Sequence, residues 1–593
     1  MKKCIRWMSL AAVVFAAAGV LWGCGSGAGR EASATMAAQP PPAANTYAAK
    51  AAETMAAMEA AVPGPVMDDG SMPEDGEGSP MVAHNTEEYR YNPENPFMAV
   101  SGAPLSTFGA DVDTASYANI RRMLLGGSPV PEDAVRIEEM LNYFYYDYPE
   151  PKEQEPFSVT TRLAECPWNQ PHSLLQIGLQ AKKLDEDALP ASNLVFLLDV
   201  SGSMDAPDKL DLVKRAFLTM TENLKDGDSV SIVTYASSDK VVLDGASGSD
   251  RTRIMTAIEN LEAGGSTAGS KGIKTAYELA EKHFIKGGNN RVILATDGDL
   301  NVGVTSEGGL TRLIQKKRKS GVFLSVLGFG TGNIKDNKME ALADNGNGQY
   351  AYIDSMAEAR KVLVEEMGGT LFTVAKDVKF QVEFNPAKVK GYRLIGYENR
   401  VMADQDFDDD TKDGGEIGAG HRVTALYEII PAGSADALPS PSLKYQQAAG
   451  TAADKTDDGT DHESDRETAE APSFNDEWLT VKIRYKDPDS DKSSLLEYPV
   501  KDDCYYSEMP EDMDFASCVA ETGLLLKHSE YAGDASYGSI IGRLQDMKRV
   551  KEDDYSGEFL YLVKGWPDID AGVCLKIHSR HLHAPINGTM EPG

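Results

Sequence analysis

Three residues that follow one apolar stretch have the types and the spacing to bind a metal ion. Asp199, Ser201 and Ser203 form an Asp-x-Ser-x-Ser sequence directly after the apolar run 194–198. One carboxylate and two hydroxyls offer only oxygen, which suits hard cations such as Mg²⁺, Ca²⁺ or Mn²⁺ and does not suit zinc or copper. Because open α/β sheets place ligands outside the carboxyl ends of their strands, the pattern predicts a metal-binding loop after a buried strand.

Two further stretches offer the ligands that such a loop still lacks. Thr267 ends the tight sequence GGST before a helical pattern, and Asp297 follows a second apolar strand, 291–296. Taken singly, each motif is more typical of a polar loop or a turn. Side chains from the three loops converge only if the two strands are neighbours in one sheet. Taken together they predict a single site with five oxygen donors: Asp199, Ser201, Ser203, Thr267 and Asp297.

The order, the spacing and the strand context of NLVFLLDVSGSM, GGST and RVILATDGD resemble those of the von Willebrand factor A domain. The resemblance implies an α/β, Rossmann-like fold with a mostly parallel sheet, and a metal-ion-dependent adhesion site. It also implies that Thr267 binds the cation directly in the engaged state and that the aspartates bind it directly or through water. A protein partner's Asp or Glu carboxylate then fills the remaining coordination position. We expect Mg²⁺ first, with Ca²⁺ or Mn²⁺ as alternatives.

The chain begins with a sequence typical of export rather than of a fold. A basic start and the short apolar run 9–21 end in Leu-Trp-Gly-Cys, which resembles a bacterial lipoprotein signal with Cys24 as the lipid-bearing residue. The alternative is an ordinary secretory signal. Residues 25–92, rich in Ala, Pro, Gly, Met and acidic side chains, predict a disordered spacer. We therefore expect a lipid-anchored protein of the bacterial cell envelope, in the outer membrane, facing the periplasm or the cell surface.

Strand patterns occur on both sides of the predicted A domain. Neither flank has enough strands to close a core, so we expect the A domain to be inserted in a β-sandwich-like domain with flanking helices. The regions PLSTFGADVDTASYANIRR and DFASCVAETGLLLKHSEYAGDASYGSIIGRL resemble the flanks of a bacterial subfamily of A-domain lipoproteins. The predicted organisation is 1–24 signal, 25–92 spacer, 93–191 helices and first strands, 192–370 A domain, 371–510 β-rich domain with a disordered insertion at 433–472, 511–566 helical region and 567–593 tail.

Three other groups of residues invite a metal-site interpretation. Asp111 and Asp113 are better explained as the start of a helix. An acidic cluster fails the calcium-loop pattern and favours a solvated loop, with a loose second cation site as the alternative; it comprises Asp404, Asp406, Asp408, Asp409, Asp410 and Asp413. The tail has four potential transition-metal ligands in no fixed pattern, which favours a disordered end; these are Cys574, His578, His581 and His583.

Composition excludes some classes of function. The 593 residues carry a net charge of −34, which argues against a nucleic-acid partner. No Gly-x-Ser-x-Gly elbow and no Ser–His–acid or Cys–His set is recognisable, so we expect no enzyme. After Cys24, the cysteines allow one or two disulfides whose pairing stays open: Cys166, Cys504, Cys518 and Cys574. The sequence favours a membrane-anchored binding protein that contacts its partner through a divalent cation. The alternatives are a structural envelope protein with a stabilising metal site and a metal-dependent hydrolase.

Overall fold

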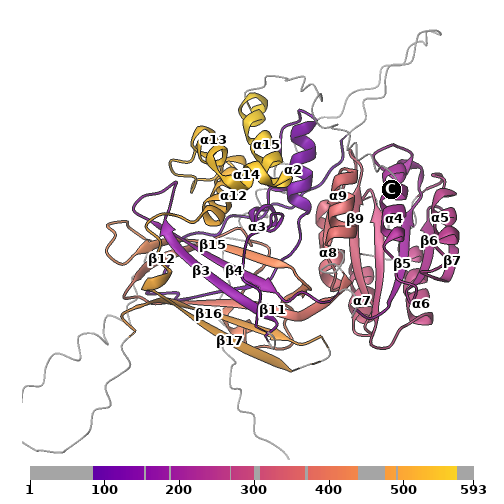
Figure 1. Ribbon diagram of the computed structural model, residues 1–593, viewed down its shortest axis with the longest axis horizontal. Coiled ribbons are helices and arrows are strands. Elements are labelled where there is room, and N and C mark those ends of the chain that lie inside the picture. The colour runs from indigo at the N-terminus through magenta and orange to yellow at the C-terminus, as the bar shows by residue number, and fades with distance from the viewer. Residues whose placement is uncertain are drawn as a thin grey trace, which may run out of the picture. The chain divides into compact units, whose positions relative to one another are not determined.

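A six-stranded sheet with helices on both faces forms the α/β domain, between residues 192 and 366 (Figure 1). The computed structural model describes residues 85–152, 155–185, 189–266, 269–298, 307–366, 371–438, 474–488, 490 and 492–570. The strands are, in spatial order, β10 (Tyr350–Ile353), β9 (Phe323–Phe329), β8 (Asn289–Thr296), β5 (Ser192–Asp199), β6 (Ser229–Tyr235) and β7 (Asp239–Ser247). All neighbouring strands are parallel except β7, which pairs antiparallel with β6, so the sheet is mostly parallel as expected.

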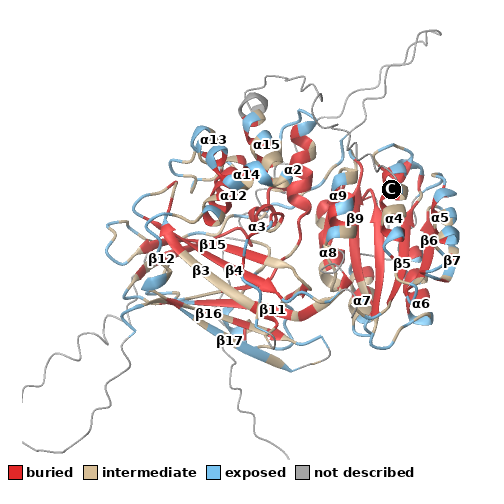
Figure 2. Ribbon diagram, in the orientation of Figure 1, coloured by how far each residue is buried: buried red, intermediate tan, exposed pale blue. Residues whose placement is uncertain are grey.

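The helices of the α/β domain cover both faces of its sheet, so β5 and β8 are buried along their whole length (Figure 2). One face packs against α4 (Leu210–Glu222), α5 (Arg251–Glu259), α9 (Met356–Arg360) and the π-helical turn η4 (Lys361–Glu365). The other packs against α6 (Gly269–Lys282), α7 (Glu307–Arg318) and α8 (Asp336–Asn345). The apolar residues of α4 recur with a 3.6-residue period and form one buried face.

Two antiparallel sheets enclose a second core, which confirms the sandwich. One sheet has β1 (Met98–Ala99), β12 (Val389–Ile395), β15 (Arg422–Pro431), β4 (Ser173–Ala181) and β3 (Phe157–Glu165). The other has β13 (Val401–Met402), β2 (Leu105–Gly109), β11 (Thr373–Phe384), β16 (Glu477–Lys486) and β17 (Ser493–Lys501), with β14 (Gly415–Gly418) paired to β11. Strands β1 to β4 precede the α/β domain and β11 to β17 follow it, so the α/β domain is an insertion in the sandwich.

Helices from both ends of the chain share one further core, which we call the helical cluster. Its members are α2 (Ala115–Leu125), α3 (Ile137–Asn142), α12 (Glu511–Leu526), α13 (Tyr537–Asp546), α14 (Lys548–Glu552) and α15 (Asp554–Asp570). Short 3₁₀ turns complete the described elements: η1 (Glu132–Ala134), η3 (Gly202–Met204), η5 (Asp404–Asp406) and η6 (Asp502–Cys504). Among the described residues, no helix is both long and apolar enough to cross a membrane.

Several residues assigned to predicted disordered segments have a defined structure. Residues 85–92, assigned to the spacer, are ordered: Thr86 and Glu88 donate backbone hydrogen bonds to residues 332 and 334 of the α/β domain. Residues 433–438 of the predicted insertion are ordered as well, and α15 continues to residue 570. Their composition predicts disorder. Composition does not reveal the contacts that order residues 85–92, because those contacts come from residues far away in the sequence. The remainder of the spacer, of the insertion and of the tail, with Cys24, lies outside the described residues.

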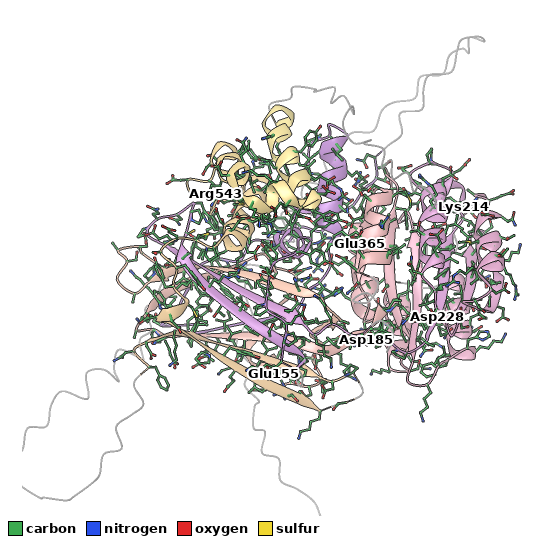
Figure 3. All side chains as sticks on the ribbon, in the orientation of Figure 1. Glu155, Asp185, Lys214, Asp228, Glu365 and Arg543 are labelled. Atoms are coloured by element: carbon green, nitrogen blue, oxygen red, sulfur yellow. The ribbon has the colours of Figure 1, made fainter. Side chains whose placement is uncertain are left out.

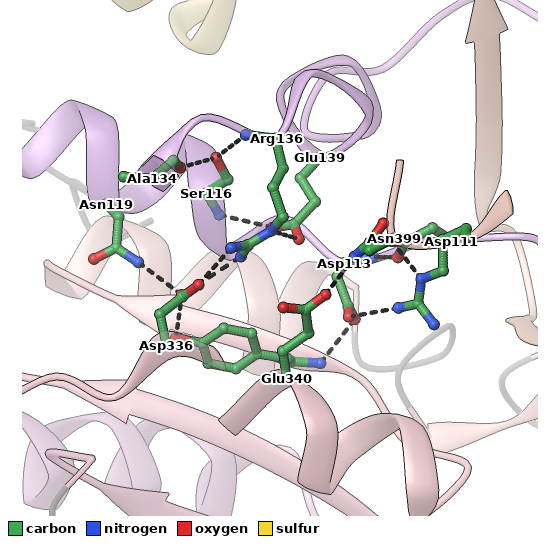
Figure 4. Close-up of polar contacts among 12 residues, drawn as sticks. Asp111, Asp113, Ser116, Asn119, Ala134, Arg136, Glu139, Asp336, Glu340 and Asn399 are labelled. Atoms are coloured by element: carbon green, nitrogen blue, oxygen red, sulfur yellow. Dashed lines mark hydrogen bonds and ion pairs between the residues drawn. The ribbon is translucent and has the colours of Figure 1, made fainter. Parts of the chain in front are cut away.

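Asp111 and Asp113 do not start a helix by capping it, contrary to our interpretation. The N-cap of α2 is Thr114, and it makes no side-chain capping bond. Instead, Arg400 pairs with Asp111 at 3.0 Å and with Asp113 at 3.5 Å. Asp113 also accepts a 2.8 Å hydrogen bond from the backbone of Tyr350, so these aspartates join the α2 segment, the sandwich and the α/β domain (Figure 4). Sequence alone could not supply a partner almost 290 residues away.

A buried ion cluster fixes α3 to α8. Arg136, directly before α3, forms ion pairs with Glu139 on α3 and with Asp336 on α8, and all three side chains are buried (Figure 4). Tyr350 donates a further hydrogen bond to Asp336 at 2.9 Å. Buried charges require such partners, because an unpaired ion away from water is strongly unfavourable.

The acidic loop after β13 is bound by basic side chains. Arg484 contacts Asp408 and Asp410 at 3.3 and 3.1 Å, and Arg318 pairs with Asp413. In the part of the chain that the structure describes, no group of three or more His, Cys, Asp or Glu side chains could bind a metal. The cysteines of that part, Cys166, Cys504 and Cys518, are free thiols.

Candidate metal site

The two predicted aspartates lie at the ends of neighbouring strands. Strands β5 and β8 pair in parallel, with Leu198 opposite Ala295, so Asp199 and Asp297 leave the same edge of the sheet. Both carboxylates are fully buried. The structure thus brings together the loops of Asp199 and Asp297, as the strand context of the motifs implied.

The Asp-x-Ser-x-Ser loop is organised by its own first residue. Asp199 accepts a 2.9 Å hydrogen bond from the backbone N–H of Ser201 through Oδ1 and a 3.1 Å bond from the Thr296 hydroxyl through Oδ2. The hydroxyl oxygens of Ser201 and Ser203 lie 3.0 Å apart. Ser201 is buried whereas Ser203 is exposed, so this pair of oxygens runs from the interior to the surface.

Burial raises the pKa of Asp199 to about 6, the nearby charge of Asp297 adds to the rise, and the hydrogen bonds from Ser201 oppose it. Two carboxylates in one buried place repel each other. An environment of this kind favours a bound cation, because the cation stabilises both charged forms at once.

The loop that leads to Thr267 begins against the first loop. Gly202 donates its N–H to the carbonyl of Gly265 at 2.9 Å, and Gly264 donates to the carbonyl of Val200 at 2.8 Å. Gly265 has φ +84°, and a Cβ there would lie 2.6 Å from the Ser237 hydroxyl, so the turn favours glycine. Thr267 itself lies outside the described residues, and its place among the ligands stays a prediction.

Asp297 has a partner that the sequence analysis missed. The Lys209 ammonium, at the start of α4, donates to Asp297 Oδ2 at 3.1 Å and to Asn333 Oδ1 at 2.9 Å. Thr296 was also missed, although it stands in the Thr-Asp-Gly sequence beside Asp297. No spacing rule points to Lys209, which meets Asp297 only through the fold, or to Asn333, which contacts Lys209.

The residues present fit a hard divalent cation. The described donors are two carboxylates and two hydroxyls at one sheet edge, all oxygen, with one hydroxyl at the surface. Half of these donors are hydroxyls, so the site is not a cluster of His, Cys and carboxylate side chains. The histidine of the α/β domain, His283, pairs with Asp244 on the edge strand β7 at 2.6 Å. The geometry suits binding of a cation and docking of a ligand oxygen.

Three family models match the chain. "von Willebrand factor" matches residues 83–176, "von Willebrand factor type A domain" matches 193–366, and "Uncharacterized protein YfbK, C-terminal" matches 369–569. The type A match coincides with the domain that carries Asp199 and Asp297.

Two curated relatives and one solved structure are similar to the chain. The chain is 41% identical over 487 residues to the uncharacterized protein YfbK of Escherichia coli K12, covering 81% of each chain. It is 32% identical over 188 residues to the uncharacterized protein sll0103 of Synechocystis, covering 31% of this chain and 43% of that protein. A solved von Willebrand factor type A protein from Catenulispora acidiphila is 17% identical, with TM-score 0.37, over 71% of this chain and 91% of that one. At 41% identity over 81% of each chain, this chain belongs to the YfbK family of bacterial proteins, and it carries a von Willebrand factor type A domain.

Proposed function

We propose that this protein is a lipid-anchored protein of the bacterial cell envelope that binds a protein partner through a divalent cation. The ligands of that cation are Asp199, Ser201, Ser203, Thr267 and Asp297, with Mg²⁺ the expected ion. The observation that carries the proposal is the pair of buried aspartates at one sheet edge beside two hydroxyls 3.0 Å apart. The bound cation supplies a local positive charge that an Asp or Glu carboxylate of the partner can contact.

The placement of the hydroxyls favours docking over a purely structural metal. Gly202 and Ser203 are exposed, so the outer side of the site is accessible to a partner. A stabilising ion needs no such opening. The chain's net charge of −34 would repel an acidic partner elsewhere on the surface, and the cation provides the attraction at this one place.

We expect capture of the partner to depend on the cation. The full chain, immobilised with Mg²⁺, should retain partner proteins from an envelope extract, and a chelator should release them. Ser201→Ala removes one ligand oxygen at little steric cost and should lose the same proteins. Ser249→Ala, at an exposed serine near the opposite end of the strands, should keep them. Capture at the wild-type level by the Ser201→Ala protein, or by the wild type in the presence of chelator, would refute the docking role.

The lipid anchor gives a separate expectation. Replacing Cys24 with serine removes the thiol that would carry the lipid and should move the protein from the membrane pellet to the soluble fraction. Fractionation and immunoblotting of cells that express each form would measure this. Retention of the Cys24→Ser form in the pellet after a salt wash would contradict the anchor.

A further inference from the structure

We infer that Lys209 sets the charge of the cation site, weakening its hold on the cation while strengthening the attraction of the loaded site for a carboxylate. The inference rests on the proposed function, since it concerns the same site. Its basis is the ion pair between the Lys209 ammonium and Asp297, at 3.1 Å, on a carboxylate that is fully buried. The Lys209 side chain is itself only 10% exposed, so the charge acts where water screens it little.

The position of the ammonium is fixed by the loop after β9. Asn333 accepts its second hydrogen bond at 2.9 Å. Gly330 has φ +75°, and a Cβ there would overlap the Lys209 side chain, so the chain turns at a residue that leaves room for it. These contacts hold the Lys209 ammonium against the Asp297 carboxylate.

The same loop is held by the ordered end of the spacer. Gly332 accepts a backbone hydrogen bond from Thr86 and donates one to the Glu87 carboxylate, both at 2.8 Å. Glu87 in turn contacts the guanidinium of Arg122 on α2 at 3.0 Å. The loop that positions Lys209 is thus anchored outside the α/β domain's own sequence.

Charge then decides the direction of both effects. Two aspartates and one ammonium carry a net charge of −1, so a dication leaves the site at +1. Without the ammonium, the same dication leaves it neutral. Other charges nearby, such as Asp208, act equally in both cases, so the difference of one unit remains. Lys209 therefore repels the incoming cation and adds to the attraction that the loaded site exerts on a carboxylate.

Removing the charge should move the two affinities in opposite directions. We expect Lys209→Met, in the full purified chain, to bind Mn²⁺ at least about tenfold more tightly by calorimetry. At equal Mn²⁺ occupancy, the same variant should broaden the methyl proton signal of added acetate less than the wild type does. A merely structural lysine would not produce opposite changes.

Two further variants make the test decisive. Lys209→Gln retains an N–H donor for Asp297 without the charge and should behave as Lys209→Met does; it also serves if the methionine variant does not fold. Lys214→Met removes a lysine elsewhere on α4 and should change neither affinity (Figure 3). Unchanged or weaker Mn²⁺ binding in both Lys209 variants, or unchanged or greater acetate broadening, would overturn the inference. Absence of Mn²⁺ binding by every form, including the wild type, would instead overturn the proposed function.

Discussion

Replacing Asp297 with alanine is expected to abolish Mg²⁺ binding by the full chain. The carboxylate is fully buried at the end of β8 and supplies half of the negative charge of the site. Loss of groups that only orient metal ligands commonly lowers metal affinity about 10–100-fold, so loss of a charged ligand should exceed about 100-fold. Isothermal titration calorimetry with Mg²⁺, Ca²⁺ and Mn²⁺ measures the effect and ranks the three ions.

Two controls separate ligation from damage to the fold. Asp211→Ala removes an exposed aspartate from the first turn of α4 and should leave cation affinity unchanged. Asp297→Ala also leaves Lys209 without its carboxylate partner, so a lower melting temperature is expected alongside the loss of binding. Asp297→Asn keeps the shape and removes the charge, and it should show the same loss. Wild-type cation affinity in a folded Asp297→Asn protein would exclude Asp297 as a ligand.

The largest effect on stability is expected from Arg136. Arg136→Met preserves much of the side-chain volume but leaves Glu139 and Asp336 buried without their cation. Breaking a buried ion pair by removing one partner typically lowers the free energy of unfolding by about 3–5 kcal/mol. The apparent melting temperature of the full chain, followed by circular dichroism, should fall by several degrees.

The pH dependence of that loss has a definite sign. Burial raises the pKa of Glu139 from 4.5 to about 8, in spite of the opposing attraction of Arg136, and the charge of Asp111 adds to the rise. Between pH 4.5 and about pH 8, Glu139 holds a proton in the folded state that it has released in the unfolded state. The free energy of unfolding therefore falls as the pH rises through this range. Without Arg136 the pKa rises further, and the penalty should be smaller at pH 5.5 than at pH 8.

An exposed arginine provides the comparison. Arg253→Met removes a side chain that is 59% exposed and pairs with Asp250 at 3.9 Å, so it should change stability by no more than about 0.5 kcal/mol. Equal melting temperatures for the Arg136 and Arg253 variants would show that the cluster does not stabilise the contact between α3 and α8. A loss of stability in the Arg136 variant that grew toward pH 5.5 would contradict the raised pKa of Glu139.

Local sequence determined the strands of the α/β domain and the loop that ends the first of them. The run 194–198 is apolar at every position because both faces of β5 are covered by helices, and burial on both sides leaves that signature in any parallel sheet. Asp199 and Ser201 follow it within three residues, and their hydrogen bond is equally local. The helix α5 was not expected, because only Ile254 and Ile258 of its nine residues are buried and its periodic signal is short.

Only the tertiary structure decided which distant charges meet. Lys209 and Asp297 are 88 positions apart, and their contact exists because α4 starts beside the carboxyl end of β8. Asp111 and Asp113, which local pattern assigned to a helix start, pair with Arg400 across almost 290 residues. Periodicity reports whether a position is buried and what its near neighbours bond to. It carries no information about the path of the chain, and that path selects the partner of each buried charge.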